Sequence, residues 1–453
     1  MTASAASLVL AAGALSALMA LVPALRRANA LGDLDSSTIL TFGVAALMTI
    51  PAVLVTAEGD FTRRLDVFRE LVAVYPSWYS AAVRLGVLMT GILALVLLTR
   101  RLLLGDVRLH VAGLVAVLLW SLAHLSAALH SDATVTPRGL VLLACFAAAT
   151  VLPRGRGAPL GAGIFAVGLA IASGFAALFR YDKAFVPCRE ECTPLGAALQ
   201  GVLPNENLLG VTLVAAMPFA FLGFRGAARY GFCAFLAAMA VATTSRTATA
   251  AAVVVFVALL VVRPRLDGPR EGVGRTTVAA FVLVGAMAAS LLVVQHRWDN
   301  TSLTNRPTLW HVASGYIERS PWFGYGPEKW ATLYESSEIP RAAQRTAHNQ
   351  WMDVLVVAGI VGALVLFVLL ASMILSAEGA LPGILLAIAA VFLVGTTEGA
   401  WAIGYVDLLS FSLLALLLTG PVAPESNPAW TLRPAGARRH PLPFVPRAGE
   451  TTP

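Results

Sequence analysis

The chain has 453 residues, of which 58% are hydrophobic and only 13% are charged, and its mean hydropathy is +0.78. A soluble domain carries about 25% charged residues, so this composition excludes a soluble protein and indicates one that crosses a membrane many times. The formal charge of +7 could suggest a nucleic-acid partner. Nearly all basic residues are arginines in short links between apolar runs, however, so we attribute the charge to membrane topology and expect no nucleic acid.

Apolar runs of the length needed to cross the hydrocarbon follow one another along the chain. The backbone must satisfy its own hydrogen bonds in lipid, and runs rich in Ala, Leu and Val with interspersed Gly suit packed helices rather than a barrel. We therefore predict an all-α polytopic bundle with about 12 to 13 spans. The candidate spans are residues 7–25, 38–56, 80–99, 110–129, 139–152, 159–178, 208–223, 230–243, 248–262, 277–294, 351–374, 381–395 and 404–419. The first run lacks a basic leading segment, and we interpret it as a span rather than a cleaved signal.

The arginine-rich short links predict the orientation of the bundle, because short loops with excess Lys and Arg stay in the cytoplasm. These links hold Arg26 with Arg27, Arg100, Arg101 and Arg108, Arg154 with Arg156, Arg225 with Arg229, and residues 263–275. The exterior face of the membrane then receives residues 180–207, Arg246 and residues 296–350. The same assignment puts the N-terminus outside.

We divide the chain into three parts. Residues 1–200 form N-terminal scaffold spans, and residues 201–420 form a second membrane domain with one long exterior loop at 296–350, before the third-last span. The tail at 421–453 is rich in Pro, Ala and Arg, and we expect it to be disordered and cytoplasmic. Residues 58–79 combine mixed charges with aromatic residues, which we interpret as an interfacial helix.

The four cysteines do not form a framework. Cys145 and Cys233 lie inside apolar runs, where a small core residue is the simplest interpretation. Cys188 and Cys192 share a polar loop and would form a disulfide if that loop faces an oxidising compartment. No His lies near this pair to complete a metal site, and we expect neither a metal ion nor a cofactor.

Two arginines stand out on the predicted exterior face. Arg246 occupies a link of a few residues between two short apolar runs, where a guanidinium is costly unless it reaches the interface or meets an anion. Arg306 lies on the same face, and two such side chains offer forked donors suited to a phosphate or pyrophosphate. The alternatives are an Arg that marks a helix end and, for Arg306, a surface salt bridge to Glu318.

His348 lies directly at a loop-to-helix junction on that face. A neutral imidazole at the mouth of a cavity is a suitable proton acceptor for a sugar hydroxyl at neutral pH. Its neighbour Asn349 suits the N-cap of the following span, and we also predict that it contacts substrate. His296 and His311 are the nearest rivals for the role of base.

The loop over residues 320–330 contains Gly and Pro in a pattern that predicts a tight, irregular backbone. Its aromatic residues could rest on lipid, or stack on a sugar ring or prenyl chain. A belt of interfacial Trp is the common explanation for the many tryptophans between residues 298 and 351. We predict substrate contacts for Tyr325 in this loop and for Asn305 and Trp310 before it.

Several short motifs, in order and at their spacing, resemble the O-antigen ligase and polymerase superfamily. They are Thr244–Thr247, Asn305–Trp310, Pro321–Gly326, Ala347–Asn349 and Val357–Gly362, preceded by a polar turn at Pro204–Gly210. The resemblance covers roughly residues 200–365. Members commonly have twelve spans, where this sequence predicts thirteen.

This resemblance implies an integral membrane glycosyltransferase that takes a glycan from an undecaprenyl-pyrophosphate carrier on the outer face of the cytoplasmic membrane. Neither a nucleotide sugar nor a metal would be needed, and the acceptor would be a hydroxyl of a glycan or lipid. It implies that Arg246 and Arg306 bind the pyrophosphate and that His348 deprotonates the acceptor. The diphosphate is a good leaving group once its charge is compensated, so the acceptor oxygen is the atom that needs activation.

Other interpretations remain open at this point. The sequence does not separate a ligase, which attaches a finished glycan to a different acceptor, from a polymerase of repeat units. A transporter or flippase of lipid-linked or amphipathic substrates is the alternative from another class. Sparse charge inside the spans disfavours it. A structural scaffold would leave Arg246, Arg306 and His348 unrelated.

Overall fold

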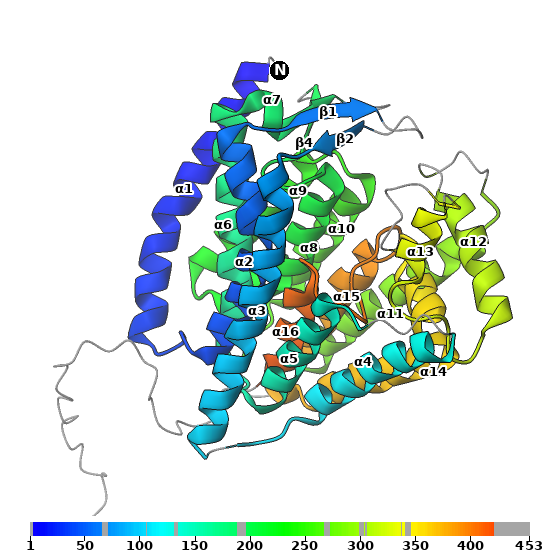
Figure 1. Ribbon diagram of the computed structural model, residues 1–453. Coiled ribbons are helices and arrows are strands. Elements are labelled where there is room, and N and C mark those ends of the chain that lie inside the picture. Colours follow the sequence, from blue (N-terminus) through cyan, green and yellow to red (C-terminus); the bar gives the residue numbers. More distant parts are fainter. Residues whose placement is uncertain are drawn as a thin grey trace, which may run out of the picture.

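Helices make up most of the structure, a computed structural model that describes residues 3–65, 71–105, 107–130, 135–187, 196–266, 272–298, 303, 306–336, 338–339 and 346–420. The α-helices within these ranges are α1 (Ala3–Ala30), α2 (Ser36–Glu58), α3 (Ser77–Leu103), α4 (Val111–Leu129), α5 (Pro137–Val151), α6 (Gly157–Phe179), α7 (Tyr181–Ala184), α8 (Glu206–Gly223), α9 (Ala227–Ala242), α10 (Arg246–Val262), α11 (Val273–Gln295), α12 (Arg306–Arg319), α13 (Lys329–Glu335), α14 (Gln350–Leu375), α15 (Leu381–Val394) and α16 (Ser410–Leu418) (Figure 1). A short 3₁₀ helix, η3 (Glu378–Ala380), precedes α15.

Each predicted span contains a helix, which confirms the all-α membrane bundle. Within the described residues, eight helices are long and apolar enough to cross a membrane, namely α1, α2, α3, α4, α6, α8, α11 and α14. Four other apolar helices are shorter. The last predicted span, 404–419, is helical only over α16, which is too short to cross on its own. Its helix starts late because Asp407 accepts a hydrogen bond from the Ser410 amide at 2.9 Å and holds the preceding chain in a turn.

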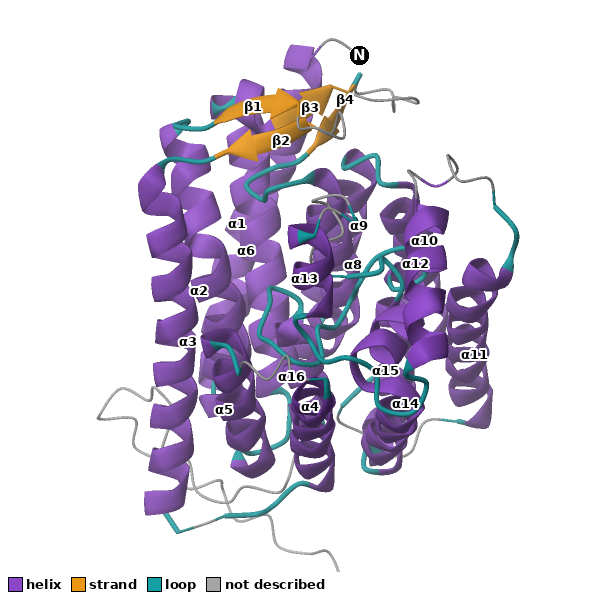
Figure 2. Ribbon diagram, turned by 45° about the vertical axis from the view of Figure 1, so that its right-hand side comes forward, coloured by secondary structure: helices purple, strands orange, loops and turns teal. Residues whose placement is uncertain are grey.

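Two antiparallel hairpins lie at the end of the bundle where α1 begins (Figure 2). They are β1 (Thr62–Leu65) with β2 (Leu71–Val74), and β3 (Phe185–Pro187) with β4 (Ala197–Leu199). The expected interfacial helix over residues 58–79 is therefore wrong. Arg63 favours the strand, because its guanidinium donates hydrogen bonds to the carbonyls of Asp182, Lys183 and Phe185 and ties the first hairpin to the second.

Helices α6 and α8 form the centre of the bundle. Every residue of α8 from Leu209 to Gly223 is buried, as expected for a helix that is apolar on all sides. Close packing between the two helices depends on Gly163, where an added Cβ would lie 2.9 Å from the Cα of Ala220. One continuous cluster of buried side chains reaches from α1 to α16. The proposed boundary at residue 200 therefore does not separate two hydrophobic cores. The different roles assigned to the two parts stay a prediction.

The polar segment over residues 296–350 is more ordered than the long loop that the sequence predicts, because it contains α12 and α13. These helices have a small core of their own, in which Trp310 and Trp330 pack with Ala347 and with Met352 of α14. The segment is thus fixed to the start of α14. Figure 1 shows it as a separate group of helices beside the main bundle.

Helix α14 is interrupted at Gly359, whose φ is +63°. The chain at Pro321–Gly326 crosses this interruption, and Tyr325 N and Gly326 N donate hydrogen bonds of 2.8 Å to the carbonyls of Val356 and Val357. A Cβ at residue 359 would lie 2.4 Å from the Trp322 carbonyl, so only glycine permits the crossing. Irregular backbone of this kind is tolerated at membrane depth where protein covers it. The tight loop predicted for residues 320–330 is confirmed.

Candidate active site

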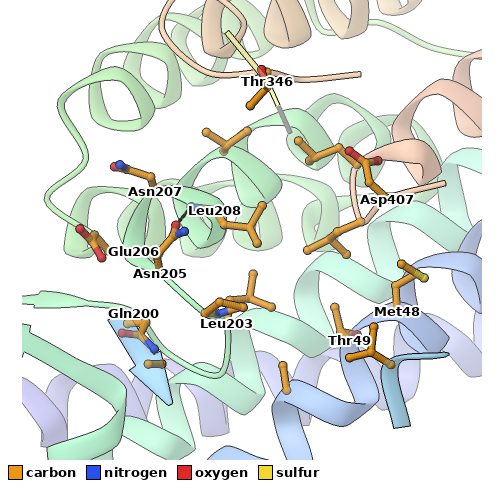
Figure 3. A pocket seen from close by; sticks show the side chains of 18 of the residues that line it. Met48, Thr49, Gln200, Leu203, Asn205, Glu206, Asn207, Leu208, Thr346 and Asp407 are labelled. Atoms are coloured by element: carbon orange, nitrogen blue, oxygen red, sulfur yellow. Dashed lines mark hydrogen bonds between the residues drawn. The ribbon is translucent and has the colours of Figure 1, made fainter. Parts of the chain in front are cut away.

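A cavity of about 1020 Å³ lies between the β1–β2 hairpin, the starts of α3 and α8, and the chain at 346–353 and 398–409. Figure 3 shows Thr346 and Asp407 across the cavity from Asn205 and Asn207. The volume is at the upper end of the range of about 300–1,000 Å³ for ligand sites. Charges of both signs line the wall, from Arg63, Arg84, Arg138, Arg306, Glu206, Asp353, Glu398 and Asp407. The cavity therefore has room and polarity for a large polar ligand.

Glu398 joins two of the predicted site residues at the wall of this cavity. Its Oε1 accepts a hydrogen bond from Nη2 of Arg306, and its Oε2 lies 2.7 Å from Nδ1 of His348. The three side chains are largely buried, with between 11% and 17% of their surfaces exposed. Arg306 and His348 are therefore held on one shared carboxylate.

This carboxylate determines the chemistry of His348. Because an ionised carboxylate can only accept, the contact assigns a proton to Nδ1 and leaves the lone pair of the neutral ring on Nε2. Burial raises the pKa of Glu398, but the charges and hydrogen bonds of Arg306 and His348 outweigh burial, so this pKa lies below its ordinary value. Glu398 is ionised at neutral pH and can stabilise an imidazolium. A base oriented by a carboxylate in this way is suited to accept a proton from a hydroxyl.

Arg306 retains hydrogen-bonding capacity beyond this pair. Its Nη1 donates to the Leu303 carbonyl at 3.2 Å, while its buried Nε has no hydrogen-bond partner among the described residues. A guanidinium cannot lose its charge in a protein, and a buried donor without a partner is unusual. Each Nη group also carries a second hydrogen, so Arg306, which lines the cavity, can donate to an anionic ligand there while it holds Glu398.

The backbone at His348 is held in a conformation that few non-glycine residues adopt, with φ +54°. Asp353 fixes it from the first turn of α14, because its carboxylate accepts hydrogen bonds from the Thr346 hydroxyl and from Ala347 N, the latter at 2.7 Å. The Thr346 hydroxyl in turn lies 3.1 Å from the amide of His348. Such conformations persist only where the surroundings over-determine them, and they gather at functional sites.

Asn349 and Gln350 connect the His348 segment to the chain that carries Glu398. Asn349 is fully buried and caps α14 as predicted, while its amide nitrogen donates to the carbonyls of Ser290 and Thr396 at 2.8 and 3.0 Å. The Gln350 side chain accepts from the amides of Ala400 and Trp401. Asn349 therefore positions two segments of the site, and it does not line the cavity.

Trp310 and Tyr325, both predicted substrate contacts, also lie outside the cavity lining. Trp310 is buried and donates from Nε1 to the Ala347 carbonyl at 3.0 Å, beside His348. The ring of Tyr325 packs against those of His130 and Tyr316, with centroids 4.4 and 5.3 Å away. Both residues support the chain around the site.

Arg246 lies near the site but is not part of the cavity wall. Its side chain is exposed at the start of α10. The next residue, Thr247, contacts the hydroxyl of Thr397, so this helix begins beside the chain that carries Glu398. Of the other predicted positions, Asn305 and the pair Cys188 and Cys192 lie outside the described residues.

Sequence reasoning missed Glu398, Asp353 and Thr346. One signal was available for Glu398, which is an isolated carboxylate between the apolar runs at 381–395 and 404–419. Ionisable residues in such surroundings are rare and mark functional sites. For Asp353 the signal was weaker, because a carboxylate in the first turn of a helix is already explained by the helix dipole.

Comparison with known proteins agrees with the family resemblance of the sequence motifs. A family model described as O-antigen ligase matches residues 231–367, a segment that contains Arg246, Arg306 and His348 but not Glu398. No curated protein and no solved structure matches the chain. The family supports glycan transfer in the synthesis of envelope polysaccharide, from lipid-linked substrates, by a multi-pass membrane protein. Residues 231–367 thus match an O-antigen ligase domain, which supports the resemblance to the superfamily of O-antigen ligases and polymerases.

Proposed function

We propose that the protein transfers a glycan from an undecaprenyl-pyrophosphate carrier to an acceptor hydroxyl in the cavity beside His348. The observation that carries this proposal is the shared carboxylate of Glu398, which contacts a general-base candidate and a diphosphate-binding candidate together. The family match does not favour the alternative of a transporter.

In the proposed reaction, Nε2 of His348 takes the proton of the acceptor hydroxyl. The acceptor oxygen forms a bond to the anomeric carbon, and the bond between that carbon and the diphosphate oxygen breaks, with its electron pair leaving on the diphosphate. A single displacement of this kind inverts the anomeric configuration. The proton remains on His348, where Glu398 stabilises the imidazolium until the proton passes to solvent.

Arg306 would bind the diphosphate and compensate for the charge that develops on the leaving oxygen. Its position supports this role, because Arg306 lines the cavity and Glu398 holds its guanidinium there. Arg246, at the nearby start of α10, would meet the same diphosphate from outside the cavity wall. Guanidinium groups that supply this compensation make a metal ion unnecessary, which is the second part of the proposal.

The site would face the exterior. The cavity is lined by residues 186–187, 200 and 203–207, which belong to the segment predicted outside, and by Arg306 and His348. The arginine-rich links lie at the other ends of α6, α8 and α10, as the preference of basic loops for the cytoplasm requires.

The deciding experiment uses purified protein in detergent with an undecaprenyl-pyrophosphate-linked glycan, an acceptor and EDTA. We expect transfer to proceed with EDTA present, and the variant His348→Ala to lose about 10²–10⁴-fold in rate, the usual contribution of a general base. His311→Ala is the matched control, because His311 is the rival histidine and its side chain is exposed on α12. Transfer by His348→Ala at the wild-type rate would remove the proposed base, and loss of transfer in EDTA would remove the metal-free mechanism.

A further inference from the structure

A second cavity, of about 260 Å³, lies at the end of the bundle opposite the candidate active site. Five guanidinium groups from separate segments line it, together with an apolar floor. The arginines are Arg27 at the end of α1, Arg156 before α6, Arg225 between α8 and α9, Arg229 in α9 and Arg265 after α10. Among the described residues that line this cavity, none is acidic.

One carboxylate beside the cavity fixes its inner wall. Asp33 accepts hydrogen bonds from Nε and Nη2 of Arg225 at 3.0 and 2.9 Å, and lies 3.9 Å from Nε of Arg156. Arg156 is buried and donates to the Leu222 carbonyl at 2.7 Å. Asp33 therefore fixes the positions of Arg156 and Arg225 at the inner wall of the cavity.

The remaining arginines form the rim. Arg229 lies over the rings of Phe221 and Tyr230, at 5.2 and 5.4 Å, and the guanidinium of Arg27 lies 3.7 Å from the Cβ position of Gly226. Arg27 and Arg265 are exposed. Guanidinium groups keep their charge in proteins, so their convergence on one cavity favours an anion between them. Forked donors of this kind suit phosphate oxygens.

The position of the cavity favours a lipid headgroup as the source of such a phosphate. Helices α6 and α8, with 23 and 18 residues, extend from the cavity towards the other face. At 1.5 Å per residue they measure roughly 35 and 27 Å, close to the hydrocarbon thickness of about 30 Å, so the cavity lies at headgroup level. Large apolar side chains are exposed on the adjoining turns, Val22 on α1 and Val261 on α10, as for a surface that contacts acyl chains.

We infer that this basic cavity binds the phosphate of an anionic phospholipid, with the headgroup among the five arginines and the acyl chains along α1 and α10. Basic pockets between helices on the cytoplasmic side are a known form of lipid recognition. The inference does not depend on the proposed transfer reaction, because the cavity shares no lining residue with the candidate active site.

The test is native mass spectrometry of the purified protein titrated with phosphatidylglycerol or phosphatidylcholine. We expect wild-type protein to retain phosphatidylglycerol at least about tenfold more tightly than phosphatidylcholine, a difference of about 1.4 kcal/mol. The rim variant Arg27→Gln/Arg229→Gln/Arg265→Gln should lose this preference. The control variant Arg26→Gln/Arg108→Gln/Arg275→Gln removes the same charge from exposed positions outside the lining, and should keep it.

Three outcomes would overturn the inference. They are an undiminished preference in the rim variant, an equal loss in the control variant, and full displacement of phosphatidylglycerol by an equal concentration of inorganic phosphate, which would assign the cavity to a free anion. If the triple variant does not fold, the double variant Arg27→Gln/Arg265→Gln, which changes only exposed side chains, carries the same expectation.

Discussion

Replacement of Glu398 by Gln tests the central contact of the candidate site, because it removes one charge and almost no volume. The carboxylate faces both Arg306 and the ring of His348 in a largely buried setting. An imidazolium about 4 Å from a carboxylate gains about 4 kcal/mol at an effective dielectric constant of about 20. At 1.36 kcal/mol per factor of ten, loss of this stabilisation lowers kcat on the order of 10³-fold.

The assay is transfer from an undecaprenyl-pyrophosphate-linked glycan, with melting temperature measured on the same samples. Glu398→Asp keeps the charge and should fall between the wild type and Glu398→Gln. Glu378→Gln removes a carboxylate at the opposite end of α15 and should stay within about twofold of wild type. If Glu398→Gln folds and transfers glycan at the wild-type rate, Glu398 neither orients His348 nor stabilises its imidazolium, and the proposed role of Glu398 is wrong.

Three further predictions concern neighbouring contacts. Arg306→Lys should reduce transfer by more than about tenfold, because an ammonium cannot present the same fork to Glu398 and a diphosphate; an unchanged rate would leave Arg306 a packing role. Gly359→Ala should lower the melting temperature, because φ +63° costs about 1–2 kcal/mol for a residue with a Cβ and the Cβ would overlap the Trp322 carbonyl. Gly285→Ala, in open space on α11, is its control, and equal melting of the two variants would contradict the crossing. Because folding lowers the pKa of Glu398 below its ordinary 4.5, its contribution to stability should be complete above pH 4.5 and decline as pH falls through the lower folded-state pKa. The gap in melting temperature between wild type and Glu398→Gln should therefore narrow below pH 4.5, and a gap that widens there would contradict the assignment.

The helices could be predicted from the sequence because each depends on local composition. Runs of apolar residues need no partner to be recognised, and every predicted span contains a helix. The hairpin at β1 could not be predicted in this way, because Arg63 is fixed by carbonyl groups more than a hundred residues away. The pattern of neighbouring residues in the sequence does not indicate such a long-range contact.

Part of the candidate site could be predicted from the sequence for the same reason. Arg306 and His348 stand out as polar residues in short motifs, whereas Asn349 and Trp310 occur in the same motifs and turn out to hold backbone rather than line the cavity. Glu398 lies beyond the motifs, in a turn between two apolar runs. Its importance comes from distant partners, and only the folded chain brings them together.

The order in which the chain is made gives the Glu398 contacts a further consequence. Arg306 and His348 precede their shared carboxylate by 92 and 50 residues, so both are synthesised and enter the membrane before their counter-charge exists. The nascent protein carries the charge of Arg306 without Glu398 until α15 and the turn after it have emerged. The contacts among these three side chains can therefore form only after α15 has been made, and a ribosome that stops after α14 leaves a bundle of helices without the Glu398 carboxylate.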